Sequence, residues 1–299
     1  MKIVQFYLPE SGLRLGLVRE GEIVDITSQA LSSALDLIEY ADNERLTVSE
    51  AIDKYARPEQ GGLYSYNALD VEPDPSRPHL VCPLHPPEVW ACGVTYKPSA
   101  DFRDEDMEIS RGIYGHVYSA RRPEIFFKAT APRCVGPNGE IGIRSDSSFT
   151  ASEPELALAL GSDGRVLGYM AANDVSAWDI ERENPLYLPQ SKIFSGCCAL
   201  GPIIVSADEI GDPYDLEITC RMSRNGEPIF EGAVRTSQMK RKFEELITFL
   251  RMSNPIPAGT VMLTGTGIIV PPGLPLMPGD IVEITIDGIG TLRNRAKIV

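Results

Sequence analysis

Two glutamates lie two positions apart at the start of an apolar stretch. The segment SEPELALAL, residues 152–160, places Glu153 and Glu155 immediately before alternating leucines and alanines. Because side chains i and i+2 of a strand point to the same side, both carboxylates are predicted on one face, where Ala157 and Ala159 leave space. Two like charges held together raise each other's pKa unless a cation lies between them. The pattern predicts a site for a hard cation such as Mg²⁺ or Mn²⁺, with two unconnected surface glutamates as the alternative.

A third carboxylate, Asp174, ends the next apolar segment along the chain, GYMAAND. The turn GSDGR separates segments 155–160 and 165–173, which can pair as a hairpin and bring Asp174 beside the glutamates. Asp174 could instead cap a helix, because a polar segment with Ser176 follows it. If the hairpin forms, the three carboxylates make a predicted metal site.

Lys192 follows in the segment LPQSKIF, between a proline and an apolar pair. Burial beside Ile193 and Phe194 would lower the pKa of its ammonium group. Such a lysine can serve as an acid, a base or an anion clamp. The ordinary alternative is a solvated surface lysine.

Two groups of elements must position these side chains. A small N-terminal α+β domain is predicted over residues 1–80. It contains strands at 2–7 and 14–25 and helical spacing over 29–56, and it ends in a linker at 72–88 that holds six prolines. Neither a helix nor a central strand tolerates that density of proline, so a second domain is predicted over residues 81–299.

The second domain is predicted to be rich in strands. A charged segment at 98–120 interrupts it and is expected to be an exposed flap that is helical in its early part. The predicted strands lie at 89–94, 124–129, 150–160, 165–173, 198–205, in a hairpin at 216–232 and at 261–267, with a helix at 239–252 and two last strands at the C-terminal end. Many strands and few helices indicate a β-rich α+β fold.

Composition restricts the classes of function. The net charge of −14 argues against nucleic acid as a partner, and an acidic ligand would need a lysine, an arginine or a cation to offset the field. The six cysteines show no C-x-x-C spacing, which argues against a zinc cluster. No run of about 18 apolar residues and no secretion signal is present, so we expect a soluble, cytoplasmic protein with no membrane partner.

Taken together, E-x-E, GY…ND, Q-S-K and the T-G-T-G turn at 264–267 resemble the fumarylacetoacetate hydrolase family over about residues 85–299. The resemblance implies a mixed-sheet, β-roll core preceded by a small N-terminal domain. It also implies that Glu153, Glu155 and Asp174 hold Mg²⁺, with Mn²⁺ or Ca²⁺ as substitutes, and that Lys192 lies in the substrate pocket.

The stretches WACGVTYK, RPEIFFKA and ENPLYLPQSK resemble the branch of this family that dehydrates 2-keto-3-deoxy sugar acids such as 2-keto-3-deoxy-D-arabinonate. In that branch the glutamate of the RPE segment, here Glu124, lies in the active site. Family hydrolases usually carry N-Y-x-x-H after the first core strand, but here Thr95 replaces the asparagine and Ser99 replaces the histidine. The missing histidine favours a lyase over C–C hydrolysis.

The resemblance implies loss of water from a 2-keto-3-deoxy pentonate to give 2,5-dioxopentanoate, in pentose catabolism. Lys192 would contact the oxo acid and help to move the proton, and Glu124 would act as general base or as acid toward the leaving hydroxyl. Substrate-binding positions are expected at Thr266, Gly265 and Gly93. The flap at 98–120 would exclude water, and its His116 could approach a ligand or simply be solvated. A homodimer or homotetramer is expected by resemblance.

Other functions remain open from the sequence. A family hydrolase could act on an acylpyruvate or another diketo acid, and a decarboxylase could act on oxaloacetate through the same kind of metal site. Two alternatives are not enzymes. The protein could be a non-catalytic, metal-dependent sensor of sugar acids, or the cation could have a purely structural role.

Overall fold

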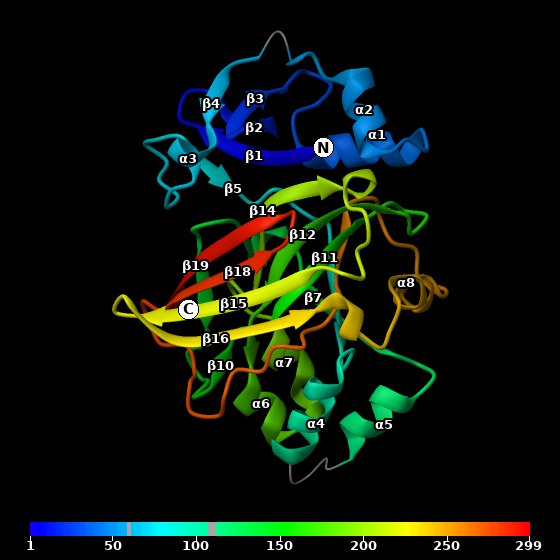
Figure 1. Ribbon diagram of the computed structural model, residues 1–299, viewed down its shortest axis with the longest axis vertical. Coiled ribbons are helices and arrows are strands. Elements are labelled where there is room, and N and C mark those ends of the chain that lie inside the picture. Colours follow the sequence, from blue (N-terminus) through cyan, green and yellow to red (C-terminus); the bar gives the residue numbers. More distant parts are fainter. Residues whose placement is uncertain (59–60, 107–111) are drawn as a thin grey trace.

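The computed structural model describes residues 1–58, 61–106 and 112–299, and Figure 1 shows a small N-terminal part above a larger, strand-rich part. The N-terminal part contains β1 (Lys2–Leu8), β2 (Gly12–Arg19), β3 (Glu22–Asp25), α1 (Ala34–Asn43), α2 (Val48–Tyr55), β4 (Leu63–Ser65), α3 (Tyr66–Leu69) and β5 (His79–Val81). The predicted helical spacing over 29–56 forms two helices, because Thr47 starts a new one. Its side chain accepts a hydrogen bond from the backbone N–H of Glu50, and Glu50 accepts one from the N–H of Thr47 in return.

The larger part holds the remaining strands and helices. Its elements are β6 (Val89–Gly93), α4 (Lys97–Asp106), α5 (Ile113–Ser119), β7 (Glu124–Ala129), β8 (Cys134–Val135), β9 (Glu140–Ile143), β10 (Thr150–Ala151), β11 (Pro154–Leu160), β12 (Val166–Asp174), β13 (Ser176–Ala177), α6 (Trp178–Glu183), α7 (Leu188–Lys192), β14 (Cys198–Ser206), β15 (Glu217–Arg224), β16 (Glu227–Arg235), α8 (Phe243–Arg251), β17 (Thr260–Leu263), β18 (Ile281–Ile286) and β19 (Gly290–Ile298).

Two large sheets pack against each other. The first runs in the order β4-β3-β2-β1-β14-β12-β11-β17-β6-β7, with β5 beside β1 and β8 beside β14, and the second runs β16-β15-β18-β19-β9. Most neighbours are antiparallel, but β17 pairs with β6, β14 with β8 and β19 with β9 in parallel. The β-rich α+β class with a mixed-sheet core that the sequence predicts is confirmed.

The first sheet continues across the predicted domain boundary. β1 pairs with β14 through Lys2 opposite Val205 and Ile3 opposite Ile204, so the N-terminal strands extend the sheet of the core. The division at residues 80 and 81 stays a prediction. None of the described helices combines the length and the apolar character that a membrane span needs.

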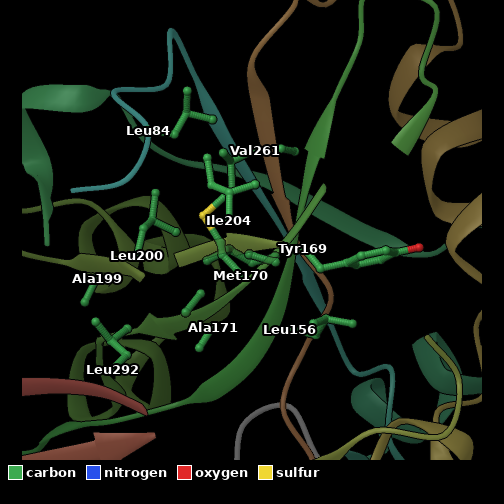
Figure 2. Close-up of a cluster of buried hydrophobic side chains, with 14 of the residues drawn as sticks. Leu84, Leu156, Tyr169, Met170, Ala171, Ala199, Leu200, Ile204, Val261 and Leu292 are labelled. Atoms are coloured by element: carbon green, nitrogen blue, oxygen red, sulfur yellow. The ribbon is translucent and has the colours of Figure 1, made fainter. Parts of the chain in front are cut away.

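The apolar core lies where the two sheets meet. Figure 2 shows side chains of β11, β12, β14 and β17 gathered with Leu84 and with Leu292 of β19. Both faces of β11 are buried, so the sequence-based expectation that its alanines leave open space is wrong. Leu37 and Ile38 of α1 lie beside Ala159 and cover this part of the face.

Two predicted segments differ from the structure. Residues 150–160 form two strands, because β10 pairs with β13 while β11 joins the large sheet, and Glu153 lies at the junction. The flap expected at 98–120 forms α4 and α5. It is not wholly exposed, since Ala100 and Tyr114 are buried against Val94. Residues 107–111 of this prediction lie outside the described residues.

Candidate active site

The carboxylates of Glu153, Glu155 and Asp174 meet at one end of the β11–β12 pair. One oxygen from each lies within 4.8 Å of the others, and all three side chains are buried. The hairpin predicted from the GSDGR turn forms, with Pro154 opposite Asn173 in its register. The alternative of Asp174 as a helix cap is not observed, because Asp174 is the last residue of β12.

Hydrogen bonds fix this end of the hairpin. The N–H of Asp174 donates to the carbonyl of Glu153 at 2.9 Å, and the N–H of Glu153 donates to the side-chain oxygen of Asn173 at 3.1 Å. The Asn173 amide in turn donates to Ser152. Trp178 donates to Oε1 of Glu153 at 2.6 Å. Glu153 therefore has a fixed position although it lies one residue before the strand begins.

Lys192 reaches the carboxylates from the C-terminal end of α7. Its Nζ lies 3.0 Å from Oε2 of Glu153, 3.1 Å from Oδ2 of Asp174 and 2.7 Å from the hydroxyl of Ser176. The predicted burial of Lys192 is observed, but the expected direction of its pKa is wrong. Burial opposes the charged form, yet Asp174 and Glu153 outweigh burial and raise the pKa of Lys192.

Glu124 enters the site from the start of β7, which pairs with β6. Burial and the nearby charge of Glu181 raise the pKa of Glu124 to about 7, against the opposing effect of Arg103 and Lys192. Gly93 lies opposite Glu124 in the strand register, and a Cβ at Gly93 would collide with the Glu124 carboxylate. Gly93 thus makes room for the glutamate as well as lining the cavity.

The two glutamates of the E-x-E motif differ in their electrostatic surroundings. Burial opposes ionisation of Glu153, but Lys192 and Arg103 hold its pKa well below the usual range. Burial and the charges of Asp174 and Glu153 raise the pKa of Glu155 well above the usual range. The site therefore has more negative charge near Glu155 than its cations compensate.

The T-G-T-G turn supports Glu155. The N–H of Gly265 donates to Oε2 of Glu155 at 2.5 Å. Gly265 has a φ of +96°, and a Cβ there would collide with the hydroxyl of Thr95, which donates to the carbonyl of Thr264 at 2.8 Å. Gly265 therefore contacts a carboxylate ligand and is absent from the residues that line the described cavity, whereas Thr266 lines it.

A small polar cavity brings most of the predicted site residues together. Five of them line it: Gly93, Glu124, Glu153, Lys192 and Thr266. Ser99, at the position where family hydrolases carry histidine, lines it too. His116 of α5 is exposed and is not among the lining residues of the described part of the chain, which fits the solvated alternative.

Arg103, Glu181 and Tyr114 belong to the site but are not predicted from the sequence. Arg103 of α4 donates to Glu153 at 2.8 Å and also pairs with Oε1 of Glu181, which accepts from the Tyr114 hydroxyl at 2.9 Å. Oε2 of Glu181 is buried and has no hydrogen-bond partner among the described residues. The charged composition of the flap shows that it contains arginine. No local sequence pattern predicts that the folded chain brings Arg103 to Glu153.

Lys128 is another residue of the site that is not predicted from the sequence. It is fully buried, and its Nζ lies 2.6 Å from Oδ1 of Asp174. A signal existed, because EIFFKA is an apolar strand segment with one lysine inside it. Lysine is almost never fully buried without a partner, so a lysine in such a segment predicts a buried ion pair.

The donor set fits a hard divalent cation. Three buried carboxylates within reach of one another are ligands that Mg²⁺ prefers, and the raised pKa of Glu155 shows that negative charge there lacks compensation. Glu153, Glu155 and Asp174 would hold the ion. The ion and Lys192 would then neutralise the carboxylates together, and Lys192 would lie close to the bound ion.

The chain is similar in sequence to a known protein family and to known enzymes. A model described as fumarylacetoacetate (FAA) hydrolase, C-terminal, matches residues 115–297. The 2-dehydro-3-deoxy-D-arabinonate dehydratase of Saccharolobus solfataricus is 53% identical over 218 residues, which cover 72% of this chain and 73% of that protein. A probable 2-keto-3-deoxyxylonate dehydratase of Haloferax volcanii is 43% identical over 221 residues, which cover 74% of this chain and 76% of that protein.

A solved structure resembles the whole chain. It is a 2-keto-3-deoxy-D-arabinonate dehydratase complexed with magnesium and 2,5-dioxopentanoate, with a TM-score of 0.85 and 40% identity. The match covers 100% of this chain and 99% of that one. The N-terminal part and the strand-rich part therefore both have counterparts in that structure.

Proposed function

The chain belongs to the fumarylacetoacetate hydrolase family, and we propose that it is a magnesium-dependent hydro-lyase of this family. Its reaction removes water from a 2-keto-3-deoxy pentonate such as 2-keto-3-deoxy-D-arabinonate and gives 2,5-dioxopentanoate, a step of pentose catabolism. The observation that carries the proposal is the buried carboxylate triad with Lys192 bound to two of its members and Glu124 in the same cavity. The two dehydratases that resemble the chain support it.

The triad of Glu153, Glu155 and Asp174 would hold Mg²⁺, and the same oxygen donors fit Mn²⁺ or Ca²⁺. When bound, the ion polarises the C2 carbonyl of a 2-oxo acid and makes its C3 protons more acidic. The remaining chemistry belongs to side chains of this chain, and each has a place in the cavity.

Lys192 binds and orients the oxo acid. Its ammonium group is charged, because Asp174 and Glu153 raise its pKa, and it lies beside the oxygens that would hold the metal. A charged donor at this place binds the carboxylate or the keto oxygen of the substrate and stabilises negative charge that develops there.

Glu124 moves the proton. With a pKa of about 7 it is ionised in a large fraction of molecules at neutral pH and can accept the C3 proton. The carboxyl that results carries a proton, which the C4 hydroxyl needs in order to leave as water. One glutamate thereby serves both steps, and the unsaturated product then tautomerises to the aldehyde.

The other cavity residues exclude competing chemistry and hold the substrate. Ser99 occupies the place of the histidine that activates water in family hydrolases, and its short side chain does not supply that base. Thr266 and Gly93 line the cavity and are proposed to contact the substrate, while Gly265 is proposed to act through backbone near Glu155. The half-buried Arg103 and the buried Glu181 close the side nearest α4.

We also propose that the protein works as a homodimer or homotetramer in the cytoplasm. Size-exclusion chromatography with light scattering tests the first part. A single species at 32.7 kDa, the mass of one chain, would contradict it.

The function is tested by incubating the protein with Mg²⁺ and a panel of 2-keto-3-deoxy sugar acids. We expect 2,5-dioxopentanoate, read out with an aldehyde dehydrogenase, and no product after EDTA treatment. Acylpyruvates and oxaloacetate serve as comparison substrates. Hydrolysis of an acylpyruvate into two acids, or faster turnover of oxaloacetate, would replace the dehydratase assignment, and tight binding without any turnover would indicate a sensor.

A further inference from the structure

Lys128 is a buried lysine that the proposed reaction does not use. It lies near the end of β7, four positions after Glu124, and its side chain is 0% exposed. Burying an ammonium group is costly unless it is paired and hydrogen-bonded, so the surroundings of Lys128 must compensate its charge. Those surroundings lie in the metal site.

Three acceptors surround the Nζ of Lys128. It lies 2.6 Å from Oδ1 of Asp174 and donates to the carbonyl of Val175 at 2.8 Å and to the carbonyl of Lys192 at 2.5 Å. An ammonium group has three donor hydrogens, and here each has an acceptor. The ring of Phe194 also lies near, with 5.7 Å between Nζ and its centroid.

The contact with Asp174 selects which of its oxygens faces the site. Lys128 takes Oδ1, while Oδ2 points to Lys192. Without Lys128 the Asp174 carboxylate could rotate about its terminal torsion, which is broad for aspartate. Lys128 and Lys192 therefore hold one Asp174 oxygen each, and the contact with Lys128 fixes which oxygen faces Lys192.

The two backbone contacts fix the ends of the elements that carry the site. Val175 follows the last residue of β12, and Lys192 is the last residue of α7. Because the carbonyl at a helix C-terminus lacks a partner within the helix, Lys128 satisfies a group that would otherwise be buried and unpaired. One side chain thus joins the metal-ligand strand to the helix that presents Lys192.

We propose that Lys128 is a positioning residue that sets the orientation of Asp174 and the backbone position of Lys192 at the same time. It touches neither the substrate nor the reacting atoms. Groups that hold the ligands of a metal commonly change metal affinity or activity by about 10–100-fold when they are removed. The proposal rests on the proposed function only for its kinetic measurement.

The test compares Lys128→Met, which keeps the length but removes the donors, with Lys128→Arg, which keeps the charge. Lys54→Met is the control, because Lys54 is an exposed lysine of α2 paired with Glu44. Mg²⁺ affinity is measured by calorimetry, and hydrogen exchange of α7 is measured in the metal-free protein. For Lys128→Met we expect Mg²⁺ affinity about 10–100-fold weaker and faster exchange over residues 188–193, with Lys128→Arg intermediate and Lys54→Met unchanged.

Kinetics separate positioning from a purely metal-related role. With Mg²⁺ at saturation, kcat of Lys128→Met should stay at least about tenfold low because Lys192 is displaced, while KM changes less. Normal Mg²⁺ affinity with normal exchange in Lys128→Met would overturn the proposal, whatever the turnover. If that variant does not fold, Lys128→Gln, with two amide hydrogens and no charge, gives the same comparison. A wild-type protein without dehydratase turnover would refute the proposed function, while the affinity and exchange measurements would still decide the role of Lys128.

Discussion

Two lysines contact Asp174, but they have different surroundings and different roles. Lys128 has backbone carbonyls as its other acceptors, whereas Lys192 lines the cavity. A lysine at the cavity wall is available to a substrate, and a lysine behind the carboxylate is not. The proposed chemistry therefore concerns Lys192.

Replacing Lys192 by alanine should separate metal binding from turnover. We expect kcat to fall by at least about two orders of magnitude, because a charged donor that stabilises negative charge in the transition state is lost. Mg²⁺ affinity should be kept or increased, because a positive charge 3.0 Å from Glu153 is removed. Steady-state kinetics and calorimetry measure the two effects, with the exposed Lys297→Ala as control. Near-normal turnover would contradict the role of Lys192.

The raised pKa of Glu124 predicts the pH dependence of the reaction. A general base must be ionised, and the pKa of about 7 means that the active form is lost as the pH falls below that value. We expect kcat/KM to increase with pH, with a midpoint near pH 7. A bound cation adds positive charge nearby and should move this midpoint to a somewhat lower pH. Glu124→Gln should lose this pH dependence along with most of the activity. A kcat/KM that falls with rising pH would assign Glu124 as the acid instead.

At the residue scale, the sequence predicts side chains that follow a local period. Glu153 and Glu155 are found by the alternation of a strand, and Asp174 by a hairpin with a short turn. Arg103 and Glu181 are 78 positions apart and meet only in the folded chain. No local pattern predicts such a pair, and for the same reason the direction of the Lys192 pKa could not be predicted before its two carboxylate partners were known.

At the scale of elements, Arg103 supplies the ion pairs between α4 and the site. Arg103 bonds Glu153 and Glu181 and lies over the rings of Tyr114 and Trp178, at 5.7 and 5.9 Å from their centroids. Apolar contacts of α4 come from Ala100, which packs with Val94 and Tyr114, and from Phe102, whose ring lies 5.3 Å from that of Trp178. The position of the helix therefore depends on these ion pairs together with the contacts of Ala100 and Phe102.

Replacing Arg103 by methionine should loosen α4 without unfolding the sheets. Removing one partner of a buried ion pair costs about 3 kcal/mol, because Glu181 loses its cationic partner, whereas Glu153 keeps Lys192. We expect the cost to appear locally, as loss of hydrogen-exchange protection over α4 and α5 and as a higher KM. The exposed Arg77→Met is the control. Unchanged exchange in α4 would show that other contacts hold the helix.

Element boundaries show where local patterns are insufficient. The alternation in 150–160 predicts one strand, but the chain leaves β10 and enters another sheet at β11. Pro154, which has no N–H, suits the start of a strand, and this was the local sign of the break. The exact sheet that each strand joins depends on partners far away in sequence.

At the scale of the whole molecule, the N-terminal part completes the large sheet. β14 is buried along its whole length and pairs with β1 on one side and with β12 on the other. α1 covers the sheet near Ala159. Without residues 1–80, the end of β14 around Ile204 and Val205 would present an unpaired apolar edge, which is a site for aggregation.

A chain shortened to residues 81–299 should therefore aggregate, although the proline-rich linker suggests an independent second domain. We expect little soluble monodisperse protein and, in what remains soluble, a lower melting temperature. Soluble yield and size-exclusion chromatography measure this. Leu63→Glu in the full chain, at an exposed position of the far edge strand β4, should behave as wild type. A soluble, stable and active 81–299 chain would show that the predicted domain folds alone.

Charge balance links the metal to the stability of the whole molecule. Five carboxylates, those of Glu124, Glu153, Glu155, Asp174 and Glu181, stand against the cations of Lys128, Lys192 and Arg103. A divalent cation offsets the excess negative charge, in a chain whose net charge is already −14. Because Mg²⁺ binds the folded state, it should stabilise that state by mass action.

At Mg²⁺ about 100-fold above its dissociation constant, this stabilisation is about 2.7 kcal/mol, which should raise the melting temperature by several degrees. EDTA should remove both the shift and the turnover, and Glu153→Gln should need more Mg²⁺ for the same shift because one ligand loses its charge. Differential scanning calorimetry across a Mg²⁺ series measures the shift, with Glu140→Gln, an exposed site, as control. A melting temperature independent of Mg²⁺, or full turnover in EDTA, would contradict the metal assignment. A shift that Glu153→Gln leaves unchanged would place the ion elsewhere in the molecule.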